Sequence, residues 1–288
     1  MGIERAIVGR HVVCLTACLM LAGLSVGQRG VRQPAGQTDA MRSAKRSDGT
    51  KSEKRKRAAA RKELAAAGKL ARVPRGTPTV DRARRLEQAL RGFEAIERRY
   101  TSTPSVAAMA AFREGEVLRR LRRVDDAVAA FERAARVDSE GIAARALVEA
   151  GHALRRAKQP SDALVRYRAS VAKRGGRYSD TARLWVAKTL ASLGRIPDAQ
   201  RGLRELGGDT HADARTRIRA FDDLAMSYVK SKDLDEAKGV IRLAEESLAA
   251  ETSADTRKSK GLRRSLEHMR ARKSIAKLEA KLRSSDRK

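Results

Sequence analysis

Several residue types are scarce in this sequence, and each shortage excludes a class of site. The two cysteines, Cys14 and Cys18, both lie in the first 27 residues, so the remainder forms neither disulfides nor thiolate metal sites. The four histidines show no metal-ligand spacing, and no Gly-rich phosphate-binding loop is present. Aromatic residues make up only 3% of the chain, too few for a base-stacking platform, and Trp185 and Tyr178 are expected to pack between helices. We therefore expect no catalytic, cofactor or metal site and no small-molecule substrate.

A ten-residue motif that recurs four times is the strongest signal in the sequence. Its marker alanines are 36, 36 and 38 residues apart: Ala127, Ala163, Ala199 and Ala237. A bulkier residue follows each marker by four positions, and a further small or apolar residue follows after three more. These spacings place all of them on one helical face. A second row of small and apolar residues precedes each motif, so every repeat predicts a helix, a short turn and a second helix.

This pattern resembles the tetratricopeptide repeat. The first two copies match its small–alanine–aromatic–small pattern well, and the last two match it more loosely: Gly115/Ala127/Phe131/Ala134, Gly151/Ala163/Tyr167/Ser170, Ala187/Ala199/Leu203/Leu206 and Ala225/Ala237/Ile241/Ala244. The usual closing proline is missing, and the steps exceed the family's usual 34 residues, as in elongated variants from bacterial envelope proteins. The resemblance implies an all-α, right-handed solenoid over 79–250, with a half repeat at 79–103 and repeats at about 108–141, 144–177, 180–213 and 218–251.

Residues 1–27 have the pattern of a secretory signal peptide. Two arginines precede an almost wholly apolar run over 12–26. This run is too short to span a bilayer, which takes about 20 residues. We expect cleavage near Gly27 and an exported, periplasmic or envelope-associated protein. The alternative is a lipoprotein anchored at Cys18, since the sequence LTAC at 15–18 resembles a lipoprotein box.

The positive charge is concentrated in the two flanks of the repeats. The net charge is +11 over 28–79 and +10 over 256–288, but only +7 over the much longer segment 80–255. The first flank, 28–78, predicts a basic, largely disordered arm with a transient helix over 54–70. The Pro-containing stretch 73–78 predicts that no first helix precedes the half repeat.

The second flank predicts a single basic helix over 256–284. Its apolar residues suggest that it caps the last repeat, with a coiled coil as the alternative. Both flanks are expected to attract an anionic surface or a polyanion such as a nucleic acid.

The resemblance also implies a partner site, because the concave groove of such repeats is lined by fixed positions of each first helix. Here these positions are mostly cationic, with apolar patches at Met109/Phe112 and Val148/Leu184. The candidate partner-binding residues are Met109, Phe112, Arg119, Arg120, Arg145, Val148, His152, Arg155, Arg156, Leu184, Lys188, Arg219, Met226 and Lys230. Such a lining suits an acidic peptide, because the arginine guanidinium group binds a carboxylate through two parallel hydrogen bonds. The alternative is that these arginines are ordinary solvated residues. The family's asparagine–lysine clamp is excluded, since the chain has no asparagine.

We therefore expect a non-enzymatic adaptor of the bacterial cell envelope that binds a protein or acidic peptide in its groove. One alternative is a polyanion or nucleic-acid binding protein that acts through its flanks. The other is a structural subunit of an envelope assembly, organised through the C-terminal helix.

Overall fold

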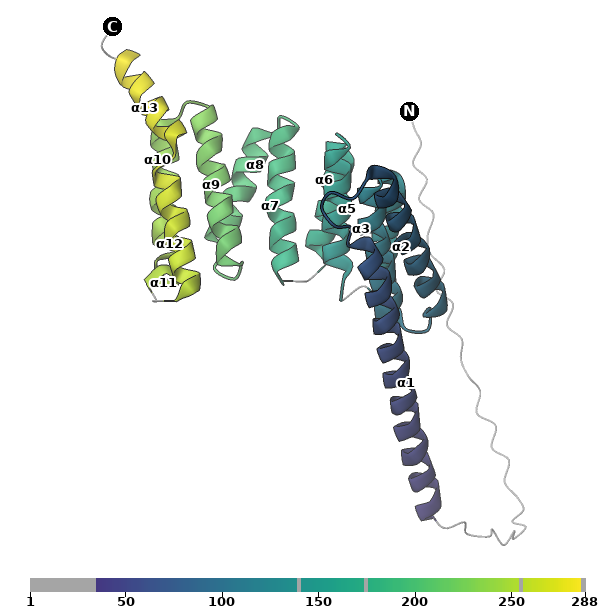
Figure 1. Ribbon diagram of the computed structural model, residues 1–288. Coiled ribbons are helices and arrows are strands. Elements are labelled where there is room, and N and C mark those ends of the chain that lie inside the picture. Colours follow the sequence, from purple (N-terminus) through teal and green to yellow (C-terminus); the bar gives the residue numbers. More distant parts are fainter. Residues whose placement is uncertain (1–34, 139–140, 174–175, 254–255, 286–288) are drawn as a thin grey trace, which may run out of the picture. The chain divides into compact units, whose positions relative to one another are not determined.

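The computed structural model describes residues 35–138, 141–173, 176–253 and 256–285 (Figure 1). The chain divides into two units, Met1–Thr50 and Lys51–Lys288. Of the first unit, the structure describes the beginning of helix α1 (Ala35–Ala71), and all the contacts discussed below belong to the second unit. The signal peptide predicted for residues 1–27 lies outside the described residues.

Four helical hairpins follow one another along the described chain. Hairpin 1 pairs α3 (Pro104–Arg120) with α4 (Val124–Val137), and hairpin 2 pairs α5 (Ala143–Arg156) with α6 (Pro160–Ala172). Hairpin 3 pairs α7 (Gly176–Ser192) with α8 (Ile196–Gly208), and hairpin 4 pairs α9 (Ala214–Lys230) with α10 (Leu234–Ser247). From α3 to α10 each helix packs against the next one in sequence, both within and between hairpins (Figure 1). With no strand among the described residues, this order confirms the predicted all-α solenoid.

Small residues of the first helices lie directly beneath large residues of the second helices. A Cβ atom at Gly115 would lie 2.8 Å from the ring of Phe131, and one at Gly151 would lie 2.5 Å from the ring of Tyr167. Real Cβ atoms do not approach other atoms so closely, so only glycine lets the two helices of these hairpins approach to this distance. The small–aromatic pairing that suggested the repeat is therefore a physical contact in hairpins 1 and 2.

The turns inside the hairpins repeat with the same period as the marker alanines. Each contains one residue with a positive φ of 62–79°: Arg122, Lys158, Gly194 and Lys232. The amide after each of these residues donates to a carbonyl five positions earlier, as Gln159 does to Leu154 (3.0 Å). This bond and the left-handed residue together form a Schellman turn, which satisfies the last carbonyls of each first helix.

The C-terminal part of α1 departs from the sequence prediction, because it packs instead of remaining a transient helix. Ala60 and Ala67 are buried against the helix that follows, α2 (Thr79–Arg99), and a Cβ atom at Gly92 would lie 3.2 Å from that of Ala67. The Glu63 carboxylate accepts hydrogen bonds from Arg99 (2.9 Å) and from the Tyr100 hydroxyl (3.1 Å). The prediction that no first helix precedes the half repeat was therefore wrong, although a helix over 54–70 was expected. The stretch 73–78 does end α1, but it also turns the chain back so that α1 and α2 meet.

The C-terminal segment also differs from the single helix predicted over 256–284. After the short α11 (Ala249–Ser253), two helices form, α12 (Arg257–Arg270) and α13 (Lys273–Ser285). Both contact α9 and α10, and their apolar residues are buried: Leu262, Leu266, Met269, Ile275 and Leu278. The break at 271–272 allows two apolar stripes on rotated faces to pack on the same neighbours. These residues cap hairpin 4, which leaves no continuous apolar seam for a coiled coil in the described part of this segment.

Candidate partner-binding site

The predicted groove residues lie on the first helices of the hairpins, α3, α5, α7 and α9. Three of the predicted apolar groove residues are core residues instead: Phe112 is fully buried, Val148 is 3% exposed and Leu184 is 5% exposed. The Arg145 guanidinium covers Phe112, 4.5 Å from the ring centroid. The close approach of the helices draws these side chains inward, so the apolar patches predicted from them are wrong. Met109, the fourth residue of the predicted apolar patches, is partly exposed.

The central part of this face carries an aromatic and cationic group that we call the Trp185 cluster: His152, Arg155, Tyr167, Trp185 and Lys188. The His152 ring contacts the Trp185 ring edge-on at 4.9 Å, and Tyr167 stacks beside Trp185 at 6.1 Å. Two cations lie over the Trp185 ring, with the Arg155 guanidinium at 4.5 Å from its centroid and the Lys188 ammonium at 5.6 Å. Helices α5, α6 and α7 all contribute, so the cluster joins hairpin 2 to hairpin 3.

Hydrogen bonding in the cluster depends on a histidine that stays neutral. Burial, together with the charges of Arg155, Arg156 and Arg119, lowers the pKa of His152 to about 4. Burial likewise raises the pKa of Tyr167 to about 12. At neutral pH the Tyr167 hydroxyl therefore keeps its proton, and it forms a hydrogen bond of 2.7 Å with Nδ1 of the neutral His152 ring. The charge of this region thus comes from the arginines and Lys188.

Arg155 of this cluster, together with Arg119 and Arg156, whose charges also act on His152, has no acidic partner in the described chain. No carboxylate of the described residues forms an ion pair with Arg119, Arg155 or Arg156, and the Nε atom of Arg119 is buried without a hydrogen-bond partner. Lys188, in contrast, binds the Asp223 carboxylate at 2.7 Å. An unpaired buried N–H group costs about 1–3 kcal/mol, so this part of the face is a favourable place for an acceptor.

The remaining predicted residues do not join this cluster. Arg120 donates to the carbonyl of Ala71 at the end of α1. Arg145 lies over Phe112 and, unlike Arg155, has an acidic partner, Glu116, at 3.9 Å. Arg219 and Lys230 of α9 are exposed. Met226 contacts the Ser274 hydroxyl (3.4 Å), so α13 reaches over that end of the predicted groove. The structure thus concentrates the candidate site in hairpins 1 to 3. Sequence reasoning placed Trp185 and Tyr167 in the packing, and no sequence signal shows that they also support this face.

Within the residues given above, no group of three or more His, Cys, Asp or Glu side chains is arranged to hold a metal ion. In that part of the chain, no helix is both long and apolar enough to span a bilayer.

Comparison with known proteins gives matches in structure only. No protein-family model and no curated protein matches the sequence. Among solved structures, MamA 41-end from Desulfovibrio magneticus RS-1 is 18% identical with a TM-score of 0.45, covering 68% of this chain and 97% of its own. YrrB, described as a TPR protein with an unusual peptide-binding site, is 19% identical with a TM-score of 0.41, covering 62% and 84%. A Rap protein complexed with competence and sporulation factor is 14% identical with a TM-score of 0.43, covering 70% and 64%. By its repeat register, consecutive helix packing and glycine–aromatic contacts, the described chain is a solenoid of tetratricopeptide-like hairpins.

Proposed function

We propose that the protein is a non-enzymatic adaptor that binds an extended acidic segment of a partner protein along the first-helix face of hairpins 1 to 3. The observation that supports this most directly is the unpaired state of Arg119, Arg155 and Arg156 around the Trp185 cluster, among the described residues. Arginine binds carboxylates through paired, charge-assisted hydrogen bonds, each stronger than a neutral one. A protein that needed these arginines only for its own stability would supply them with acidic partners, as it does for Lys188.

The experiment uses the single tryptophan of the chain as its reporter. A peptide of alternating Glu and Ala is titrated into the full chain while Trp185 fluorescence is followed, with a Gln/Ala peptide for comparison. The acidic peptide is expected to bind, and Arg119→Gln/Arg155→Gln/Arg156→Gln is expected to weaken it at least about 100-fold, since each charged hydrogen bond contributes about 1.5–3 kcal/mol.

The matched control removes the same charge elsewhere. Arg84→Gln/Arg91→Gln/Arg98→Gln changes three exposed arginines of α2 and is expected to leave binding within about threefold, because distant exposed charges are screened by salt. Equal losses in the two triple variants would show that only net charge matters, and the adaptor proposal would then be rejected.

A second candidate function rests on the exposed cations of the flanks. Lys54, Arg55 and Lys56 of α1 are exposed, as are Arg257, Lys258 and Arg264 of α12. A polyanion binder that neutralises several phosphates loses about 10³–10⁵ in affinity between 50 and 200 mM salt. Titration of the full chain with duplex DNA at these two concentrations, against Lys54→Gln/Arg55→Gln/Lys56→Gln, tests it. A weak salt dependence, or an unchanged affinity in the variant, would remove this candidate.

We also propose that the adaptor acts in the cell envelope after export. The support is the charged start and apolar run of residues 1–27. N-terminal sequencing of the protein recovered from cell fractions is the test. A mature chain beginning near Gln28 in the envelope fraction is expected, whereas an intact Met1 in the cytoplasm would contradict export.

A further inference from the structure

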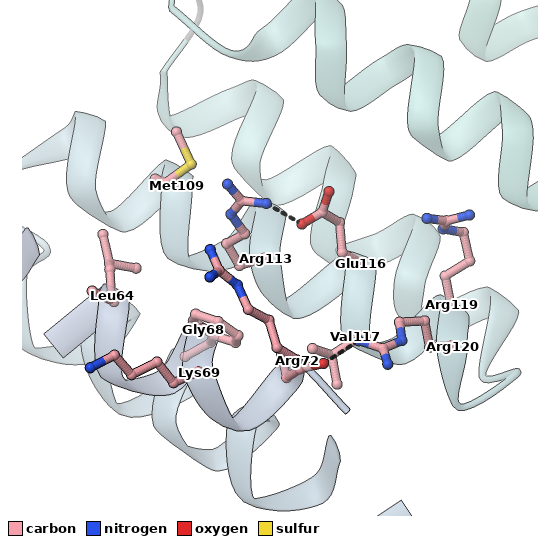
Figure 2. A pocket seen from close by; sticks show the side chains of 13 residues that line it. Leu64, Gly68, Lys69, Arg72, Met109, Arg113, Glu116, Val117, Arg119 and Arg120 are labelled. Carbon is pink, nitrogen blue, oxygen red and sulfur yellow. Dashed lines mark hydrogen bonds and ion pairs between the residues drawn. The ribbon is translucent and has the colours of Figure 1, made fainter. Parts of the chain in front are cut away.

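A cavity of about 660 Å³ lies between α1 and α3, apart from the Trp185 cluster (Figure 2). One wall is the last turns of α1 with Arg72, and the other is the exposed side of α3. Arg120 of α3 donates a hydrogen bond to the Ala71 carbonyl and so joins the two walls (Figure 2). Protein cavities of about 300–1,000 Å³ are the size that holds small organic ligands. The packing of α1, which the sequence did not predict, creates this cavity.

The cavity has an apolar floor and a cationic rim. Phe93 and Val117 are buried beneath it, and Leu64 and Met109 line it as partly buried residues. Five cations surround the opening: Lys69, Arg72, Arg113, Arg119 and Arg120. Figure 2 shows Arg72 and Arg113 extending their guanidinium groups toward the same part of the cavity from opposite walls. Two positive charges that face the same space favour an anion there, and Arg72 is the one of the two without a carboxylate partner among the described residues.

The acidic residue in the cavity lining already pairs with arginines of the protein itself. Glu116 is the one acidic residue of the lining, and it is bound by Arg113 at 2.6 Å, with Arg145 at 3.9 Å from its other oxygen. Lys69, Arg72 and Arg119 have no carboxylate partner among the described residues. The rim therefore has cationic hydrogen-bond donors available, one of which, the Nε atom of Arg119, is buried and unsatisfied.

Gly68 leaves the α1 wall open where the rest of the helix end is rich in alanine. A Cβ atom at this position would have no atom within 4 Å, so the packing of the chain does not require glycine. Glycine in a helix interior costs about 0.8–1.0 kcal/mol relative to alanine. Glycine at position 68 therefore lowers the stability of α1 without improving its packing. A close approach of a ligand to this position would explain why glycine is present.

We propose that this cavity binds a small organic anion with an apolar body, such as an alkyl carboxylate or an alkyl phosphate. The apolar body lies against the floor formed by Leu64, Met109 and Val117. The anionic head lies at the rim, where Arg72 donates to it together with Lys69. This site adjoins the proposed partner-binding face and shares Arg119 with it. Its other wall is distinct, because Gly68, Lys69 and Arg72 belong to α1 and the residue that follows it.

Isothermal titration calorimetry on the full chain tests the proposal with four probes below their micelle concentrations: decanoate, decyl phosphate, decanol and inorganic phosphate. At least one of the two alkyl anions is expected to bind with one-to-one stoichiometry, and the tighter of the two identifies the preferred head group. Decanol, which lacks the charge, and inorganic phosphate, which lacks the apolar body, are each expected to bind at least tenfold more weakly.

Three variants connect the binding to this cavity. Gly68→Leu fills the opening and is expected to abolish binding of the anion while the thermal midpoint stays the same or rises. Arg72→Gln is expected to weaken binding at least tenfold, and Lys62→Gln, an exposed change on α1 outside the lining, is expected to leave it unchanged. Failure of both anions to bind, equal binding of decanol, or unchanged binding in Gly68→Leu would overturn the proposal. Binding of the acidic peptide to Gly68→Leu, measured in parallel, keeps this outcome separate from that of the adaptor proposal.

Discussion

The Nδ1 atom of His152 lies 2.7 Å from the hydroxyl of Tyr167, so a titratable ring on α5 is held by a buried phenol on α6. The same histidine contacts Trp185 of the next hairpin. Protonation of His152 would place a charge beside Arg155 and Arg156. The state of this one ring therefore affects both the contact between two hairpins and the charge of the face that we propose binds a partner.

The first prediction concerns stability in weak acid. Burial and the neighbouring arginine charges lower the pKa of His152 to about 4, from 6.5 in an exposed histidine. Between these two values the unfolded chain binds a proton at His152 that the folded chain does not. The free energy of unfolding should therefore fall as the pH is lowered from about 6.5 to about 4, by at most about 1.4 kcal/mol per pH unit.

A pair of variants isolates the contribution of His152 from that of the carboxylates. His152→Gln keeps a hydrogen-bond partner for Tyr167 without a titrating ring. Denaturant titrations of this variant at several pH values should show a shallower loss of stability over this range. His268→Gln, on the exposed surface of α12, should follow the unmodified protein. Parallel pH profiles for His152→Gln and the unmodified protein would show that the histidine is not buried as described.

The second prediction concerns the left-handed residues in the hairpin turns. Arg122, Lys158 and Lys232 adopt φ values of 62–64°, which cost a residue with a side chain about 1–2 kcal/mol. Lys158→Gly and Lys232→Gly are each expected to raise the free energy of unfolding by about 0.5–1 kcal/mol, after the larger entropy of glycine in the unfolded chain is subtracted. Gly194→Ala, at the equivalent position of hairpin 3, should lower it by about 1 kcal/mol. Chemical denaturation measures all three, and a stabilising Gly194→Ala would contradict the turn geometry.

The third prediction concerns Arg217, whose side chain is completely buried. Its Nε atom donates to the Gly207 carbonyl of α8 (3.0 Å), its terminal nitrogen donates to the Ser247 carbonyl of α10 (2.6 Å), and it forms an ion pair with Glu251 of α11. Arg217→Met leaves these acceptors without a donor and should lower the free energy of unfolding by about 3 kcal/mol.

Arg219, two residues further along α9, provides the comparison because it is exposed. Arg219→Met should change the free energy of unfolding by no more than about 0.5 kcal/mol. Similar losses in the two variants, measured by chemical denaturation, would mean that Arg217 does not link the ends of α8, α10 and α11 as the structure indicates.

The repeat period was sufficient to predict the hairpins, because it records contacts between residues close in sequence. Gly115 and Phe131, for example, are sixteen positions apart and meet within a single hairpin. What the period did not predict depends on contacts between separate elements. The buried role of Arg217 has no sequence signature in a chain so rich in arginine. The packing of α1 depends on Ala60 and Ala67. From the sequence, these alanines indicated only that the segment could form a helix, not that it would pack.

The sequence also indicated some residues of the candidate site, because the repeat register fixes which positions of each first helix share a face. The repeat register selected Arg119, Arg155 and Lys188 as residues of one face. In the structure Arg155 and Lys188 both lie over the Trp185 ring, and the charge of Arg119 acts on His152. The same positions also selected Phe112 and Val148, which are buried. A position in a repeat indicates the direction of a side chain, but its exposure depends on how closely the neighbouring helix approaches. The cavity beside Gly68 could not be predicted at all, because it requires the tertiary position of α1.

The last prediction tests the helix contact that defines hairpin 2. A Cβ atom at Gly151 would lie 2.5 Å from the Tyr167 ring, so Gly151→Ala must displace that ring. We expect the free energy of unfolding to fall by about 1–3 kcal/mol despite the better helix propensity of alanine. Gly202→Ala is the matched control, because the new Cβ atom would lie at an ordinary contact distance of 3.7 Å from the Cβ atom of Ala187. This substitution should stabilise α8 by up to about 1 kcal/mol, since alanine has the better helix propensity. Equal stability of the two variants would contradict the close approach of α5 and α6.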